Sequence, residues 1–343
     1  MKTKKVYALH PWIDSLEKLL EYICIGETSI NFIWDPVNPD YVFVSEHIYL
    51  KKEYYKKFLK LYNNKRVFIF FAGECIAPDL NLFDYAVVFN RKLKCDDRIA
   101  RIPAMFFHQK GERILRNTLS IEAARKELVN KTGFCNFLYS NGNAHPMRDR
   151  IFYKINEYKK VDSLGAHLRN VKVDGKRGMY DWSKGGIGIK SRYKFSIAAE
   201  NATYEGYVTE KLITSLQAHT VPIYWGDPCV LEEFNAESII YCNEYETLDE
   251  VLEKVKEVDE SDELWVKKVS APWQTTEQVR KQEKELEEYR DFLAEIFSQN
   301  LRDAKRVGFG TYPKQYRIWY ARGFKLTCSE IWTKIRRKFE RHA

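Results

Sequence analysis

Short apolar runs, each bounded by polar or turn-forming residues, recur along the chain. They are rich in Val, Ile, Phe and Tyr, which is typical of buried strands in a parallel sheet. The runs that predict strands are Tyr41–Val44, Val67–Phe71, Tyr85–Phe89, Phe134–Tyr139, Tyr193–Ala198, Val221–Trp225 and Ser238–Tyr241.

Between these runs lie stretches with the composition of helices. They are Ser15–Ile25, Lys51–Tyr62, Ser120–Lys131, Arg148–Tyr158, Thr209–Ala218, Leu248–Val258 and Glu277–Phe297. Alternating strands and helices predict an α/β fold with parallel sheets. The chain of 343 residues is long enough for two such units. We expect the boundary near residues 155–165, which gives domains 1–158 and 159–313.

One segment without such a pattern is Asp174–Lys190, which holds five glycines and many charges. We expect a flexible loop there. A nucleotide-binding loop is disfavoured because the Gly-x-Gly-x-x-Gly order is missing and the segment precedes a strand instead of following one.

The charge is unevenly distributed. The net charge is +8, and residues 314–341 hold nine basic and two acidic residues, which leaves +1 for the remaining chain. A nearly neutral body argues against a globally basic nucleic-acid binder.

The seven cysteines are scattered without a Cys-x-x-Cys pair, which favours reduced thiols over disulfides or a zinc site. We expect neither a signal peptide nor a membrane-spanning segment.

The segment with the most chemical information is Tyr193–Pro228. It predicts a strand ending at Glu200, a loop, a helix that begins at Thr209, and a second strand followed by a turn. Ligands bind outside the carboxyl ends of such strands, and a helix amino terminus favours an anion such as a diphosphate. Lys211 in the first helical turn opposes the helix dipole, which an anionic ligand would explain. A solvent-exposed Glu210-Lys211 pair is the alternative if these two residues are taken alone.

The ordered string E-N…G-Y-V-T-E-K-L…A-x-T-V-P-I-Y-W-G-x-P in this segment closely resembles the donor-binding signature of the α1,3/4-fucosyltransferases, glycosyltransferase family ten. The likeness is greatest to soluble bacterial members that build Lewis-type antigens. Three further segments are similar to the family: Val67–Arg101, Phe134–Arg148 and Val161–Asn170. The chain departs from close relatives at Ala198–Ala199, where an aromatic residue usually precedes the Glu, and in the loop 202–205.

The resemblance implies a GT-B fold, with an amino-terminal domain for the acceptor and a carboxyl-terminal domain for GDP-fucose. It implies inverting transfer of L-fucose to a GlcNAc hydroxyl of a Galβ-GlcNAc acceptor, with α1,3 or α1,4 linkage. Glu74 would be the catalytic base, although taken alone it is typical of a surface turn. Arg169 and Lys211 would neutralise the diphosphate, so no metal is required. The donor pocket would be lined by Glu200, Asn201, Tyr207 and Glu210.

Several alternatives stay open at this point. Arg169 is equally typical of an exposed loop, Tyr207 of a packing residue, and Glu200 of a structural carboxylate. The role of Arg148, the linkage, the natural acceptor and the formation of a homodimer are undecided. Two other functions fit the same residues: transfer from another nucleotide sugar, and glycan binding by an inactive, membrane-tethered protein.

The basic tail, residues 314–343, predicts an amphipathic helix over Phe324–Phe339. Its apolar stripe consists of Phe324, Cys328, Ile331, Trp332, Ile335 and Phe339, with basic residues on the flanks. A basic, aromatic and amphipathic helix is typical of a membrane surface, with about 1 kcal/mol for each Lys or Arg on anionic lipid. We therefore expect a cytoplasmic protein bound to the inner face of the membrane and acting on acceptors that include lipid-linked glycans. A helix packed on the body and a nucleic-acid contact are the alternatives.

Overall fold

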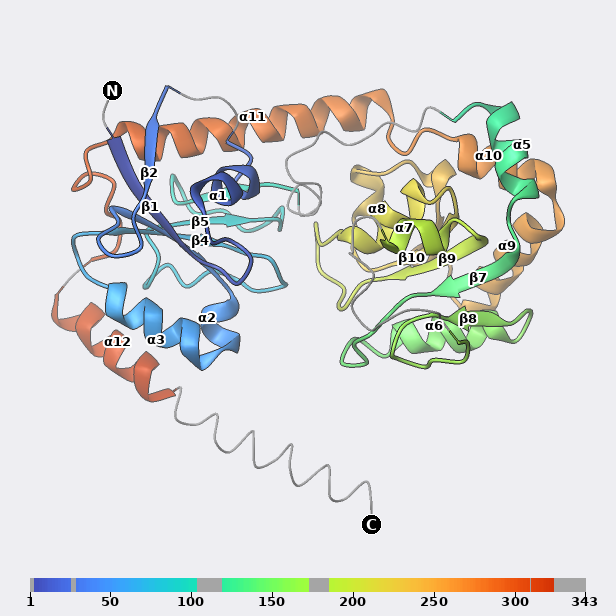
Figure 1. The fold of residues 1–343 in the computed structure, drawn as a ribbon, viewed down its shortest axis with the longest axis horizontal. Coiled ribbons are helices and arrows are strands. Elements are labelled where there is room, and N and C mark those ends of the chain that lie inside the picture. Colours follow the sequence, from blue (N-terminus) through green and yellow to red (C-terminus); the bar gives the residue numbers. More distant parts are fainter. Residues whose placement is uncertain (1–2, 26–28, 104–118, 173–184, 309, 324–343) are drawn as a thin grey trace, which may run out of the picture.

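Each strand and helix predicted between residues 15 and 297 forms, with ends shifted by a few residues. The structure is a computed structural model that describes residues 3–25, 29–103, 119–172, 185–308 and 310–323. Two α/β units lie side by side, and one long helix runs from the second unit along the first (Figure 1).

The first sheet has six parallel strands in the order β2-β1-β3-β4-β5-β6. Strand β4 in its centre is buried on both faces. Val67 and Ile69 pack toward helix α1 and the long helix α11 (Thr276–Ser298), whereas Phe68 packs toward α3. Burial on both faces explains why this strand is continuously apolar. The strands are β1 (Thr3–Leu9), β2 (Asn31–Trp34), β3 (Tyr41–Ser45), β4 (Val67–Phe71), β5 (Tyr85–Val88) and β6 (Ile99–Arg101). The helices before residue 100 are α1 (Leu16–Tyr22), α2 (His47–Leu50) and α3 (Lys52–Leu61).

The second sheet has five parallel strands in the order β11-β10-β9-β7-β8. Helices α5, α6, α9 and α10 share one core with it, and α8 packs in a separate core that includes Ala198 and Tyr224. The strands are β7 (Gly133–Phe137), β8 (Val161–Ser163), β9 (Tyr193–Ala199), β10 (Val221–Trp225) and β11 (Ile240–Tyr241). The helices are α5 (Ile121–Val129), α6 (Met147–Asn156), α7 (Gly185–Lys190), α8 (Glu210–Gln217), α9 (Leu248–Glu260) and α10 (Asp262–Ser270).

Helix α11 (Thr276–Ser298) returns the chain to the first unit. It begins with a capping box between Thr275 and Gln278. Its apolar face, which includes Leu286 and Leu293, lies in the same core as β1, β3 and β4. After α11, Lys305 forms an ion pair of 2.9 Å with the fully buried Asp84. The first unit is therefore built from both ends of the described chain.

The division between the sheets differs from the predicted boundary near residues 155–165. Strand β7 pairs with β8 and β9, so the chain enters the second sheet before residue 133. The sequence could not reveal this division because strands and helices alternate in the same way on both sides of it.

Three further expectations need correction or lie outside the described residues. Gly185–Lys190, predicted as loop, forms helix α7, while residues 174–184 lie outside the described part. Strand β1 was missed because Lys4 and Lys5 interrupt its apolar pattern; the Lys4 amine is buried and donates to the Tyr41 hydroxyl (3.3 Å). Helix α12 (Thr311–Gly323) covers the start of the basic tail, and the predicted helix 324–339 lies outside the described residues. Among the helices that are described, none has the length and apolar character needed to cross a bilayer.

A buried cluster of charges, the Arg–Glu clasp, joins the two units. Arg91, after β5, donates to Glu233 (2.5 Å) and Asp227 (3.3 Å) of the second unit. Arg101, at the end of β6, contacts Glu233 and also Glu285 on α11. The Glu233 side chain is 1% exposed, so its charge depends on these two guanidinium groups.

Replacing Glu233 with Ala is expected to destabilise the protein by about 3 kcal/mol, because both guanidinium groups lose a buried partner. Urea unfolding measures this change in the free energy of unfolding. Glu237→Ala is the matched control, since Glu237 is exposed and pairs with Lys267 at 3.6 Å; it should change stability by less than about 0.5 kcal/mol. A loss of under about 1 kcal/mol in Glu233→Ala would show that the clasp is not a stabilising interaction.

Candidate active site

Four of the charged residues singled out in the sequence, Glu74, Glu200, Glu210 and Lys211, lie where strands of the two sheets end. Glu200 directly follows β9, and Glu74 lies three residues after β4. The hydroxyl of Tyr207, in the loop after β9, donates to the Glu74 carboxylate at 2.6 Å. This hydrogen bond connects the carboxyl-terminal edges of the two sheets.

Glu200 is fully buried and organises the start of helix α8. Its carboxylate accepts hydrogen bonds from the backbone N–H (2.8 Å) and the hydroxyl (2.7 Å) of Thr209, the N-cap residue of α8. Lys211 Nζ lies 3.2 Å from the same carboxylate. Burial raises the pKa of Glu200, and the Lys211 charge opposes that rise. A carboxylate with this many donors is a structural anchor of the site.

Lys211 is the cation of the site. It contacts Glu200, Glu210 (3.1 Å) and the Thr209 hydroxyl (2.9 Å). Burial lowers the pKa of Lys211, but the two carboxylates outweigh burial and raise it overall. Lys211 therefore stays protonated and can meet an anion at the helix amino terminus.

A second lysine lies under helix α8. Lys190, the last residue of α7, donates to Thr214 (2.9 Å) and Ser215 (3.0 Å) of α8. Burial lowers the pKa of Lys190 to about 8. Sequence reasoning missed this residue because it assigned the glycine-rich segment to a loop.

Tyr207 is held between the two units. Its ring lies 5.2 Å from that of Phe89 in the first unit. The preceding Gly206 has a φ of +79°, and a Cβ there would lie 2.2 Å from the Phe89 carbonyl oxygen. Only glycine combines this backbone conformation with so close an approach. Tyr207 is thus both a packing residue and the hydrogen-bond partner of Glu74.

The charges of both sheets act on Cys75, the residue after Glu74. Burial raises the pKa of this thiol to about 12, the carboxylates of Glu74 and Glu200 add to the rise, and Lys211 opposes it. Tyr207, which binds Glu74, and Thr209, which with Lys211 binds Glu200, lie two residues apart in one loop, so this loop connects the two carboxylates.

Arg169 and Asn201 occupy different positions from these residues. Arg169 is exposed, and its Nε donates to the Gly165 carbonyl at 2.9 Å in the loop after β8. The structure does not bring it into contact with Lys211. Asn201 accepts a hydrogen bond of 2.5 Å from Arg148, which is 1% exposed and lies over the Tyr139 ring. Arg148, whose role the sequence left open, orients Asn201.

Aromatic and histidine rings line the carboxyl-terminal edge of the first sheet beside Glu74. His10, after β1, lies 5.6 Å from His47 on α2 and 5.2 Å from Trp12, between ring centroids. Sequence reasoning did not identify these residues, although the polar residues directly after the apolar run 41–44 could have indicated His47. Burial, together with the His47 charge, lowers the pKa of His10 to about 3.

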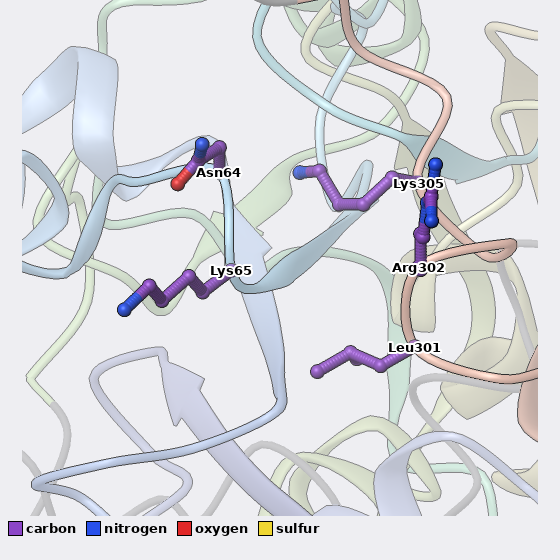
Figure 2. Close-up of a pocket in the computed structure, with 5 residues that line it drawn as sticks. All are labelled: Asn64, Lys65, Leu301, Arg302 and Lys305. Carbon is purple, nitrogen blue, oxygen red and sulfur yellow. The ribbon is translucent and has the colours of Figure 1, made fainter.

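A surface cavity of about 350 Å³ lies elsewhere. It is lined by Asn64, Lys65, Leu301, Arg302 and Lys305 (Figure 2). Asn64 and Lys65 directly precede β4, whereas Glu74 follows it, so the cavity lies at the opposite edge of the first sheet from Glu74. Within the described residues, no group of three or more His, Cys, Asp or Glu side chains is arranged to hold a metal ion.

Two parallel sheets that meet at one charged site after their carboxyl ends define a two-domain, GT-B-like α/β protein. Solved α1,3-fucosyltransferase structures share this fold: one matches with a TM-score of 0.66 and 22% identity over 90% of this chain and 93% of that chain. Another, solved with GDP-fucose, matches with a TM-score of 0.61 and 23% identity over 84% of this chain and 90% of that one.

The chain belongs to glycosyltransferase family 10 (fucosyltransferase), whose carboxyl-terminal family model matches residues 128–306. It is 32% identical over 229 residues to the alpha-(1,3)-fucosyltransferase FucT of Helicobacter pylori, which is 59% of this chain and 45% of that protein. It is 34% identical over 146 residues to the putative fucosyltransferase R654 of Acanthamoeba polyphaga mimivirus, covering 41% and 24% of the two chains. The chain therefore spans less than half the length of these curated relatives.

The site predicts a distinct pH dependence of stability. In the unfolded chain His10 binds a proton below pH 6.5, whereas in the folded protein it stays neutral down to about pH 3. The folded state therefore loses stability as pH falls from 6.5 toward 3, by at most about 1.4 kcal/mol per pH unit. His10→Phe keeps the ring contacts but has no group that takes up a proton. The variant should therefore lose less free energy of unfolding on acidification than the wild type, as measured by urea unfolding. Equal slopes in wild type and His10→Phe would contradict a His10 that stays neutral in the folded protein.

Proposed function

We propose that this protein transfers L-fucose from GDP-β-L-fucose, with inversion, to a GlcNAc hydroxyl of a Galβ-GlcNAc acceptor, in α1,3 or α1,4 linkage and in Lewis-type glycans. The observation that carries the proposal is the hydrogen bond between Glu74 and Tyr207, which lies in the loop leading into the helix that carries the Lys211 cation. Family membership supports fucose as the sugar, and the relatives' names support GDP-fucose as its donor.

In this proposal the second unit binds the donor. The diphosphate lies at the amino terminus of α8, where backbone N–H groups and Lys211 compensate its charge. Glu210 and Asn201 hold sugar hydroxyls, and Arg148 orients Asn201. Arg169 follows β8 at the same edge of the sheet and adds a second positive charge to the leaving diphosphate.

The first unit supplies the base. Glu74 removes the proton from the acceptor hydroxyl as the oxygen attacks C1 of fucose and the C1–O bond to GDP breaks. The Tyr207 hydroxyl donates to the Glu74 carboxylate, which holds one of its oxygens and leaves the other for the acceptor proton. Positive side chains neutralise the leaving group, so we expect the reaction to proceed without a metal.

Purified protein supplied with GDP-fucose and N-acetyllactosamine should form a fucosylated product, with equal rates in the presence and absence of EDTA. Product is measured by mass spectrometry, and linkage analysis on type 1 and type 2 disaccharides decides between α1,3 and α1,4. Absence of transfer to every Galβ-GlcNAc acceptor would refute the acceptor, and loss of activity with EDTA would refute metal independence. Thermal protection by UDP instead of GDP would favour another donor sugar. Glycan binding without turnover would favour an inactive binding protein.

Glu74→Gln should reduce transfer by at least about 100-fold, because the base is lost while the hydrogen bond from Tyr207 can be retained. GDP should still raise the melting temperature of the variant as it does for the wild type. Glu205→Gln is the control, because it replaces another carboxylate in the nearby loop by an amide. Glu205 pairs with the exposed Lys92 at 2.5 Å. Unchanged turnover in Glu74→Gln would exclude Glu74 as the base.

We also propose that the basic tail binds the inner face of the cytoplasmic membrane and brings the site to lipid-linked acceptors. The support is the amphipathic, basic pattern of residues 324–339. Full-length protein should float with anionic liposomes, and protein truncated after residue 323, which retains α12, should remain in the soluble fraction. Uncharged liposomes serve as the control for the electrostatic part. Equal flotation of both proteins would exclude residues 324–343 as the anchor.

A further inference from the structure

Glu46 is a buried carboxylate at the edge of the first sheet that carries Glu74. It follows β3 directly, and only 4% of its surface is exposed. Its ion-pair contact is with His47, at 3.4 Å between Nδ1 and Oε1. Burial lowers the pKa of His47, which disfavours a positive charge there. No Lys or Arg of the described residues forms an ion pair with Glu46, so this acid lacks the partner that buried charges usually have.

The carboxylate of Glu46 instead holds the turn that carries the proposed base. Strands β3 and β4 pair up to Ser45 and Phe71, and Glu46 continues this contact one step beyond the sheet. The backbone N–H of Gly73 donates to Glu46 Oε2 at 3.0 Å. A Cβ on Gly73 would lie 3.0 Å from Glu46 Oε1, so the carboxylate packs directly against the glycine.

The position of this contact links it to chemistry. Gly73 immediately precedes Glu74, whose carboxylate accepts the Tyr207 hydroxyl from the opposite unit. Burial raises the pKa of Glu46, and the negative charge of Glu74 adds to the rise. A buried acid without a cation is unfavourable for stability and is found where function requires it.

We propose that Glu46 is a positioning residue: by holding the Gly73 amide it fixes the direction in which Glu74 faces the acceptor hydroxyl. The proposal rests on the proposed function of Glu74. It assigns Glu46 no proton transfer and no contact with substrate.

The test compares two substitutions at one position. Glu46→Ala removes the acceptor of the Gly73 N–H, and kcat should fall on the order of 100-fold, as expected for a base displaced by about 1 Å. Glu46→Gln retains a carbonyl oxygen for Gly73 and can direct its amide N–H₂ to His47 Nδ1, so kcat should stay within about threefold of wild type. The KM for GDP-fucose should change little in either variant, because the donor binds to the other unit. Glu53→Ala, at an exposed position on α3, is the matched control and should retain wild-type kcat.

Three outcomes would overturn the proposal. If Glu46→Gln is as inactive as Glu46→Ala, the charge or the proton of Glu46 takes part in the reaction and the residue is not a positioning group. If Glu46→Ala keeps kcat within about threefold, the turn does not depend on it. If both variants raise the KM for GDP-fucose and leave kcat unchanged, Glu46 acts on the donor.

A double-mutant cycle adds a second measurement. Gly73→Ala should lower kcat by itself because the Glu46 carboxylate has to shift by about a few tenths of an ångström to admit the new Cβ. Once Glu46 is Ala, the same change should have little further effect, so the losses in the double variant should be far from additive. Additive losses would show that the two positions act independently and would contradict the proposal.

Amide hydrogen exchange separates this inference from the proposed function. The Gly73 amide should exchange slowly in wild type and in Glu46→Gln, and at least about tenfold faster in Glu46→Ala. If the wild type transfers no fucose, the proposed function fails, while the exchange rates still decide whether Glu46 holds the turn. Equal exchange in all three proteins would overturn the positioning role.

Discussion

The compensation of buried carboxylates is the constraint on which this structure depends. Glu200 has no exposed surface, and its two oxygens take the N–H and hydroxyl of Thr209 and the ammonium group of Lys211. A buried charge without such partners would be strongly unfavourable. The hydrogen bonds and the ion pair that Glu200 requires therefore fix the first turn of α8 and the position of Lys211.

The same constraint joins distant parts of the chain. Asp84, also fully buried, accepts the backbone N–H groups of Arg306 (2.8 Å) and Val307 (2.9 Å), and so attaches the segment after α11 to the first sheet. Glu233 attaches the second unit to two arginines of the first. Buried acids outside the strands therefore attach separate segments to one another, and the strands themselves supply the apolar core between them.

The meeting of the two units has a direct chemical consequence. Neither sheet contains a complete site: Glu74 belongs to the first unit, and Tyr207 and Lys211 belong to the second. The Arg–Glu clasp and the return of α11 to the first core hold the units so that the Tyr207 hydroxyl reaches Glu74. An enzyme that transfers a group between two substrates can in this way bind each on its own domain and join them at the boundary.

The sequence by itself determined the local elements with continuous apolar runs or helical patterns, and it predicted an anion site. Apolar runs such as Val67–Phe71 identified strands because burial on both faces demands continuous hydrophobicity. The order of residues from Glu200 to Lys211 indicated an anion site, because a helix amino terminus and a strand end are adjacent in the chain. Tertiary structure decided what depends on long-range pairing. It placed β7 in the second sheet, returned α11 to the first, buried Lys4 in a strand and formed α7 from glycine-rich sequence. It also set Glu46 against Gly73, since contacts between residues far apart in the chain arise only from packing.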